Sequence, residues 1–270
     1  MDKKLFVILE QGNKCNTELS YEHKEQFSGE YCDWFRLNWK NDVNDKMASF
    51  FDKDIVWTEG RSILYEKVKG KYQYYIFIDD DVKFISQTER SVQEELQYFL
   101  ETYNPIGGTL YGDNWAWNLY KKDIENSDKE VFPIMSHDLC CHIFHESFAE
   151  KVFPVYFHGS GKSMWYAQFL AYILYPHKYV TFRNVIIQNT EHLIHQDHTK
   201  VNFTSGDRLV QKFSQLIKSE KLKAEFLKWN SDVFRLLKNK YVFNNTISKE
   251  KIEFSYDALY TIINKPNSEP

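Results

Sequence analysis

The chain has 270 residues, of which 43% are hydrophobic and 17% aromatic, and its formal charge at pH 7 is −4. This length can bury a sizeable core, and ten glycines and six prolines are too few for a collagen-like or disordered chain. The negative charge argues against nucleic acid as a partner.

The spacing of the cysteines and the lengths of the apolar runs indicate the cellular compartment of the protein. The four cysteines show no metal-ligand spacing, which favours a reduced environment; they are Cys15, Cys32, Cys140 and Cys141. The apolar run over 5–9 is too short for a signal peptide, and no run reaches the roughly 18 residues of a membrane span. We therefore expect a cytoplasmic protein without a transmembrane segment.

The N-terminal part of the chain alternates between predicted strands and helices. Apolar residues over 4–12 predict a buried strand, and 31–39 is a second candidate. A short strand within 54–60 is expected to lead into a helix over 60–70, with Thr58 as its N-cap. A β-rich apolar run over 74–78 follows. Strand, helix and strand within about 30 residues form a β-α-β unit, which predicts a parallel sheet with helices on its faces.

The rest of the chain continues this alternation. A helix is predicted over 91–103, then a strand and a short helix over 131–154. Another helix is predicted over 163–176, and one or two strands over 179–192. From 207 to about 240 the pattern is helical and basic.

These elements predict an α/β fold with a Rossmann-like, mostly parallel central sheet flanked by helices. We expect a catalytic domain over 1–206, with a helical C-terminal extension over 207–270 packed on the same domain.

Three consecutive acids, Asp79, Asp80 and Asp81, follow the apolar run over 74–78. Adjacent carboxylates repel one another, and burying them is costly unless a cation or hydrogen bonds compensate. Asp79 and Asp81 are expected on the same side of an extended chain, where hard oxygen ligands suit Mg²⁺ or Mn²⁺. The alternative is a solvated acidic turn.

The segment "EGRSILYEKVKGKYQYYIFIDDDVKF" resembles the donor site of nucleotide-sugar-dependent glycosyltransferases of the GT-A fold, and its context covers roughly residues 4 to 86. Those enzymes carry an Asp-x-Asp motif, which matches the three aspartates here. The resemblance implies that Asp81 binds the metal and that Asp79 binds the ribose or the metal. It also places Arg61 near the diphosphate or the nucleoside, and Asp80 with the donor-binding residues.

The same family often takes a further metal ligand from a histidine after the last core strand. The stretch "NTEHLIHQDH" offers three histidines, of which His192 and His195 are the preferred candidates. The alternative is that they form an exposed polar loop.

The stretch "FHGSGKSMW" over 157–165 ends like a phosphate-binding P-loop. That motif needs a glycine where this chain has Tyr156. The resemblance to the GT-A transferases implies an acceptor-side loop instead, because in that family the segment before the last long helix forms the acceptor side of the cleft. Trp165 would then stack on a sugar, or else pack in the core, and Lys162 would contact a donor phosphate or an anionic acceptor.

The predicted reaction is transfer of a sugar from a nucleoside-diphosphate sugar, with a UDP-sugar favoured, to a hydroxyl of a glycan acceptor. An inverting enzyme needs a carboxylate base, for which Asp138 is the first candidate and Asp113 and Glu191 remain open. The alternatives are a metal-dependent phosphohydrolase or nuclease, and an inactive sugar-binding protein. The basic C-terminal region also permits peripheral contact with an anionic membrane, although a solvated helix face explains the same pattern.

Overall fold

The computed structural model describes residues 3–39, 45–53, 55, 57–112, 127–133, 140–153, 178–190 and 220. The described strands are β1 (Lys4–Gly12), β2 (Cys32–Asn38), β3 (Phe50–Phe51), β4 (Tyr72–Asp79), β5 (Val82–Ser86), β6 (Gly107–Gly112), β7 (Val131–Pro133), β8 (Cys141–His145) and β9 (Tyr179–Asn189). The described helices are α1 (Glu18–Gln26), α2 (Trp57–Val68), α3 (Val92–Tyr103) and α6 (Glu146–Val152). The predicted helix over 163–176 and the C-terminal extension lie outside the described residues.

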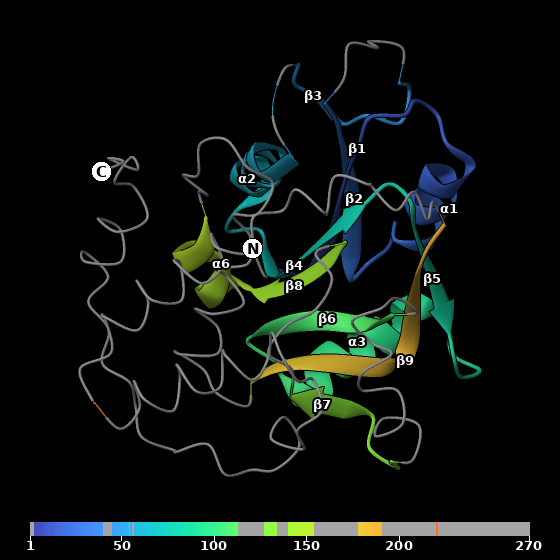
Figure 1. The fold of residues 1–270 in the computed structure, drawn as a ribbon, viewed down its shortest axis with the longest axis vertical. Coiled ribbons are helices and arrows are strands. Elements are labelled where there is room, and N and C mark those ends of the chain that lie inside the picture. The colour runs from blue at the N-terminus through green and yellow to red at the C-terminus, as the bar shows by residue number, and fades with distance from the viewer. Residues whose placement is uncertain are drawn as a thin grey trace.

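The strands form one mixed sheet in the order β3-β2-β1-β4-β8-β6-β9-β5 (Figure 1). β7 and β5 share the outer edge of β9: β7 pairs with its first half and β5 with its second. The pairings make β1, β2, β3, β4, β6 and β9 run in one direction and β5, β7 and β8 in the other. The predicted α/β fold with a Rossmann-like, mostly parallel central sheet is confirmed.

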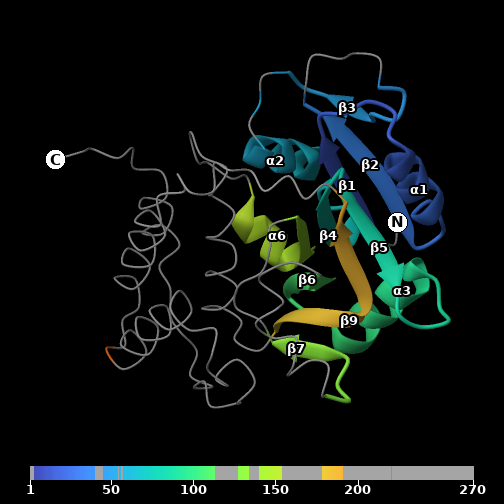
Figure 2. The ribbon, with the colours of Figure 1, turned by 45° about the vertical axis from the view of Figure 1, so that its right-hand side comes forward.

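Helices cover both faces of this sheet. α1 and α3 lie on one face, and α2 and α6 lie on the other (Figure 2). Aromatic rings fill both layers: Phe99 of α3 stacks on Phe182 of β9 at 4.6 Å between centroids, and Tyr65 of α2 lies 4.9 Å from Phe153. Because both faces are covered, the central strands β1 and β4 are almost entirely buried, which explains their continuous apolar runs.

α3 forms where its sequence predicts a helix. Ser91 accepts a hydrogen bond from the Glu94 backbone, and the Glu94 side chain bonds back to Ser91, which completes a capping box. The helix ends at Asn104, in the left-handed region at φ 41°, whose N–H donates to the Leu100 carbonyl over 3.2 Å.

Several local expectations need correction. α2 begins at Trp57, so Thr58 lies inside the helix, and its prediction as the N-cap is wrong. The short strand before α2 is β3, at Phe50–Phe51, which precedes the range 54–60 in which a strand is expected from the sequence. The strand over 131–154 is two strands, β7 and β8, followed by α6. α1, β5 and β6 were not expected as elements.

The order of the first four strands indicates at which edge of the sheet a ligand is expected to bind. From β1 the chain passes outward to β2 and β3, then crosses through α2 to β4 on the other side of β1. β1 and β4 are parallel neighbours, with Gln11 paired in register with Asp79. Ligands of open α/β sheets bind at the carboxyl ends of strands where the order reverses in this way. The carboxyl ends of β1 and β4 are therefore the edge at which to look for function.

Candidate functional site at the carboxyl end of β4

The three aspartates occupy the end of β4 and the turn into β5. Asp79 is the last residue of the strand, and Asp80 and Asp81 form the turn. The prediction that Asp79 and Asp81 lie on the same side requires an extended chain, and the extended chain ends at Asp79. The alternation of side chains along a strand therefore does not apply to Asp81. Asp79 contacts α2, whereas Asp80 contacts a residue of β2, so each carboxylate has its own surroundings.

Asp79 receives three hydrogen bonds on one oxygen. Its Oδ1 accepts from Trp57 Nε1 over 2.7 Å, from Arg61 Nη2 over 3.2 Å and from Gln11 Nε2 over 3.4 Å. Its Oδ2 accepts no hydrogen bond from any residue that the structure describes. Burial raises the pKa of Asp79 to about 7, although Arg61 and Trp57 act in the opposite direction.

Arg61 holds Asp79 from within the protein. Its side chain is fully buried, and its guanidinium carbon lies 3.9 Å from the centre of the Trp57 ring. Its Nη1 lies 2.5 Å from Nδ1 of His142 on β8, which acts as the acceptor because arginine only donates. The predicted donor-binding residue Arg61 thus contacts the acidic cluster directly, and its buried guanidinium orients Asp79.

Asp80 is held from the opposite face. Its Oδ2 accepts from Arg36 Nη2 over 3.2 Å and from the Lys14 backbone N–H over 3.5 Å. The same carboxylate packs against Gly12, where an added Cβ would lie 1.7 Å from Oδ2. Asp80 is therefore committed to contacts within the protein, and only glycine fits at position 12.

Asp81 differs from its two neighbours because no arginine among the described residues holds it. Its Oδ1 is buried and has no hydrogen-bond partner in that part of the chain. Burial and the adjacent Asp80 charge raise the pKa of its carboxyl group, while a hydrogen bond from Asn189 and the charge of Lys14 lower it. Its backbone carbonyl accepts from Thr190 N over 2.8 Å and from Thr190 Oγ1 over 3.0 Å, which ties the turn to the end of β9.

Two carboxylate oxygens at this edge therefore lack donors within the described structure, Asp79 Oδ2 and Asp81 Oδ1. Of these two, Asp81 Oδ1 is buried, and an unpartnered buried carboxylate oxygen is costly unless a cation or donor satisfies it. Hard oxygen ligands of this kind fit Mg²⁺ or Mn²⁺. The described residues contain no group of three or more His, Cys, Asp and Glu side chains arranged for a metal ion.

The other predicted site residues are not described. His192 and His195, the proposed base Asp138, and the loop residues Lys162 and Trp165 all lie outside the described residues. Thr190, which contacts Asp81, precedes His192 by two positions in the sequence. The prediction that one of these histidines joins the metal site therefore remains open.

Comparison with known proteins finds distant structural similarities. The chain is similar to the crystal structure of A197 from STIV, with a TM-score of 0.39 and 12% identity, covering 67% of this chain and 83% of that one. It is also similar to the crystal structure of the apo-form glycosyltransferase GlyE in Streptococcus pneumoniae TIGR4, with a TM-score of 0.30 and 8% identity, covering 76% of this chain and 50% of that one. No family model and no curated protein matches the chain. Similarities this distant do not indicate a function. A function therefore has to be inferred from the residues of the site.

Several residues of the site were not anticipated from the sequence. Gln11, Gly12, Arg36 and Trp57 all touch the aspartates, and Glu10 binds Arg36 beneath them. A signal was present for two of them, because Glu10 directly follows the apolar run over 5–9 and Arg36 lies between Phe35 and Leu37, positions at which a charged residue is unusual.

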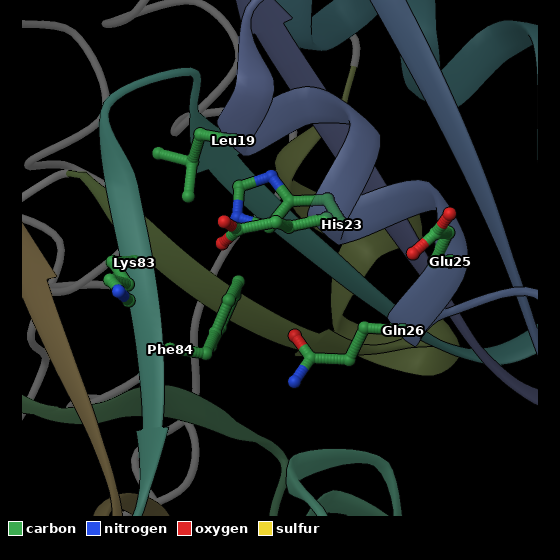
Figure 3. A pocket seen from close by; sticks show the side chains of 7 residues that line it. Leu19, His23, Glu25, Gln26, Lys83 and Phe84 are labelled. Carbon is green, nitrogen blue, oxygen red and sulfur yellow. The ribbon is translucent and has the colours of Figure 1, made fainter.

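A pocket of about 440 Å³ lies between α1 and β5 (Figure 3). Its lining residues are Leu19, Glu22, His23, Glu25, Gln26, Lys83 and Phe84, and none of the three aspartates is among them. The chemistry of the carboxylates, and not the size of this pocket, therefore identifies the candidate site. In the described part of the chain, no helix has the length and apolar character needed to cross a bilayer.

Proposed function

We propose that this protein is a metal-dependent glycosyltransferase that moves a sugar from a nucleoside-diphosphate sugar to a hydroxyl group of a glycan acceptor. The observation that carries the proposal is the pair of donor-free carboxylate oxygens, on Asp79 and Asp81, at the carboxyl end of β4. This edge adjoins β1 at the reversal of strand order, where α/β sheets bind nucleotides. The resemblance of residues 59–84 to the GT-A donor site supports the same activity.

Asp79 and Asp81 would hold a Mn²⁺ or Mg²⁺ ion, with His192 or His195 as a further ligand. When bound, the ion neutralises the charge that develops on the departing diphosphate. Arg61 and Trp57 orient Asp79 by donating to its Oδ1, and Arg36 holds the carboxylate of Asp80 in a contact within the protein. Asp79 and Asp81 would therefore be the carboxylates that hold the ion, and Asp80 would anchor the turn.

The donor and the acceptor would occupy different parts of the site. We place the nucleoside side of the donor at the end of β1, where Gly12 and Lys14 lie next to Asp80. A uridine nucleotide is the favoured donor. As the sequence predicts, we retain Lys162 as a donor-binding residue, Trp165 as an acceptor-binding residue and Asp138 as the base. The expected cellular setting stays cytoplasmic; the basic C-terminal region permits peripheral membrane contact, although a solvated helix face is the favoured interpretation of its charges.

Calorimetric titration of UDP and GDP with and without Mn²⁺ tests the proposal. We expect diphosphate binding that requires Mn²⁺, and its loss in Asp81→Asn. Asp128→Asn, at an exposed position before β7, is the control and should bind like the wild type. Hydrolysis of generic phosphoesters would instead indicate a metal-dependent phosphohydrolase. Metal-independent sugar binding with no diphosphate affinity would indicate an inactive sugar-binding protein.

A further inference from the structure

A buried carboxylate lies beneath the acidic turn and takes no part in the proposed metal site. Glu10 of β1 is fully buried and accepts four hydrogen bonds. Its Oε1 accepts from Arg36 Nη1 and from Ser20 Oγ, and its Oε2 accepts from His23 Nδ1 over 2.8 Å and from Trp34 Nε1 over 2.9 Å. All four acceptor positions of the carboxylate are therefore filled.

Glu10 remains ionised in this setting. Burial alone would raise the pKa of Glu10, but the hydrogen bond from His23 and the charge of Arg36 hold it below its usual range. A fully satisfied buried charge network of this kind is rigid, because removing a charged member leaves another buried charge uncompensated.

The first arm of the network runs from Glu10 to Asp80. Arg36 is fully buried and uses its guanidinium on several partners at once: Glu10 and Ser20 through Nη1, Asp80 and the Lys14 carbonyl through Nη2, and Asp45 through Nε. A planar guanidinium can hold such a set in fixed directions, whereas a lysine ammonium cannot. Arg36 thereby fixes the residue that precedes Asp81.

The second arm runs from Glu10 to Val82. His23 extends from α1 toward β5 (Figure 3), and its Nε2 lies 2.8 Å from the backbone carbonyl of Val82. Both partners of the His23 ring are acceptors, so the two hydrogen bonds form together only when each ring nitrogen carries a hydrogen. His23 thereby fixes the residue that follows Asp81.

We infer that Glu10 is a positioning residue for Asp81, acting through Arg36 on one side of that residue and through His23 on the other. The inference rests on the proposed function of Asp81 as a metal ligand. Thr190 supplies a third anchor by donating two hydrogen bonds to the Asp81 carbonyl. The turn is thus held at the Asp80 side chain, the Asp81 carbonyl and the Val82 carbonyl, and the Asp81 carboxylate has one oxygen unpartnered within the described structure.

Two matched substitutions separate positioning from stability. His23→Phe and Trp34→Phe each remove one ring N–H donor from the same Glu10 oxygen, but only His23→Phe also releases the Val82 carbonyl. Arg36→Lys tests the other arm with retention of charge. Two readouts are measured in the metal-free and Mn²⁺-titrated protein: hydrogen exchange of the Thr190 amide, and Mn²⁺ affinity followed by electron paramagnetic resonance.

We expect faster exchange of the Thr190 amide in His23→Phe and Arg36→Lys, with Mn²⁺ affinity about 10- to 100-fold weaker. Trp34→Phe should leave both measurements as in the wild type even if it lowers the midpoint of thermal unfolding. Unchanged exchange in His23→Phe and Arg36→Lys, or changes of equal size in Trp34→Phe, would overturn the inference. If the wild type binds no Mn²⁺, the proposed function fails, and the exchange of the Thr190 amide alone then decides whether Glu10 positions the turn.

Discussion

Replacing Gly12 with alanine gives a direct test of the geometry at the acidic turn. A Cβ at this position would lie 1.7 Å from Asp80 Oδ2, 2.0 Å from its Cγ and 2.5 Å from its Cβ. Rotating the Asp80 side chain moves the first two atoms away but leaves its Cβ in place. That last distance is about 1 Å inside ordinary carbon–carbon contact, so the backbone of the turn has to shift as well.

The expected cost follows from what the shift disrupts. Crowding of this kind costs about 1–3 kcal/mol, and losing the hydrogen bond between Arg36 and Asp80 adds about 1.5–3 kcal/mol, since both groups are charged. We therefore expect the free energy of unfolding of Gly12→Ala to fall by about 3–5 kcal/mol, a large share of the roughly 5–15 kcal/mol of a typical domain. Urea unfolding followed by tryptophan fluorescence measures it.

Two further variants make the test specific. Gly29→Ala is the control, because its added Cβ would meet only the end of the Gln93 side chain, at 3.0 Å. Asp80→Gly removes all three crowding atoms, so the double variant with Gly12→Ala should be markedly more stable than the sum of the two single effects. Wild-type stability in Gly12→Ala, or strictly additive effects in the double variant, would refute the reasoning.

Three other predictions concern the charges around the site. Asp81→Asn should leave the metal-free protein as stable as the wild type or more so, because the buried Oδ1 has no partner among the described residues; calorimetric unfolding without metal checks this, and a clear loss would contradict it. Arg61→Met should lower the free energy of unfolding by about 1.5–3 kcal/mol in urea titration, because it removes the charged hydrogen bond to the half-buried carboxylate of Asp79, and a loss below about 1 kcal/mol would count against that role. The raised pKa of Asp79 means that the folded protein binds the proton of this carboxyl group more tightly than the unfolded chain does. The resulting contribution to stability is present below pH 3.8 and is lost as the pH rises to about 7. The difference in unfolding free energy between the wild type and Asp79→Asn should show this dependence on pH, and its absence would show that the carboxyl group titrates normally.

The sequence predicts those strands and helices that bury apolar side chains. β1, β4 and α3 carry continuous or periodic apolar residues, so their patterns identify them. α1 has no such stripe, because the residues it buries are Ser20 and His23, which face the carboxylate of Glu10. β6 begins with two glycines and reads as a turn, yet a Cβ at Gly108 would lie 1.8 Å from the Val180 carbonyl, so the close approach of β9 requires glycine in this strand.

The acidic residues of the site are predictable from the sequence, but the residues that hold them in place are not. Three aspartates after an apolar run are unusual in the sequence itself, and the run marks a strand end. Arg36 and His23 lie far from them along the chain, and only the parallel pairing of β1 with β2 and the position of α1 bring them to the turn. A single sequence carries no signal for such contacts.

The pairing of β5 has a consequence for how the protein is made. β4 and β5 are adjacent in sequence but do not pair with each other; β5 pairs with β9, and the Thr190 side chain that anchors Asp81 comes 109 residues later. Such long-range contacts form slowly, and during synthesis they must wait for the later segment to emerge from the ribosome. A nascent chain that has not yet reached β9 can therefore build the β1–β4 layer but leaves β5 without its partner strand. In ribosome-bound intermediates of this protein, the acidic turn should thus lack its Thr190 anchor until β9 has been synthesised.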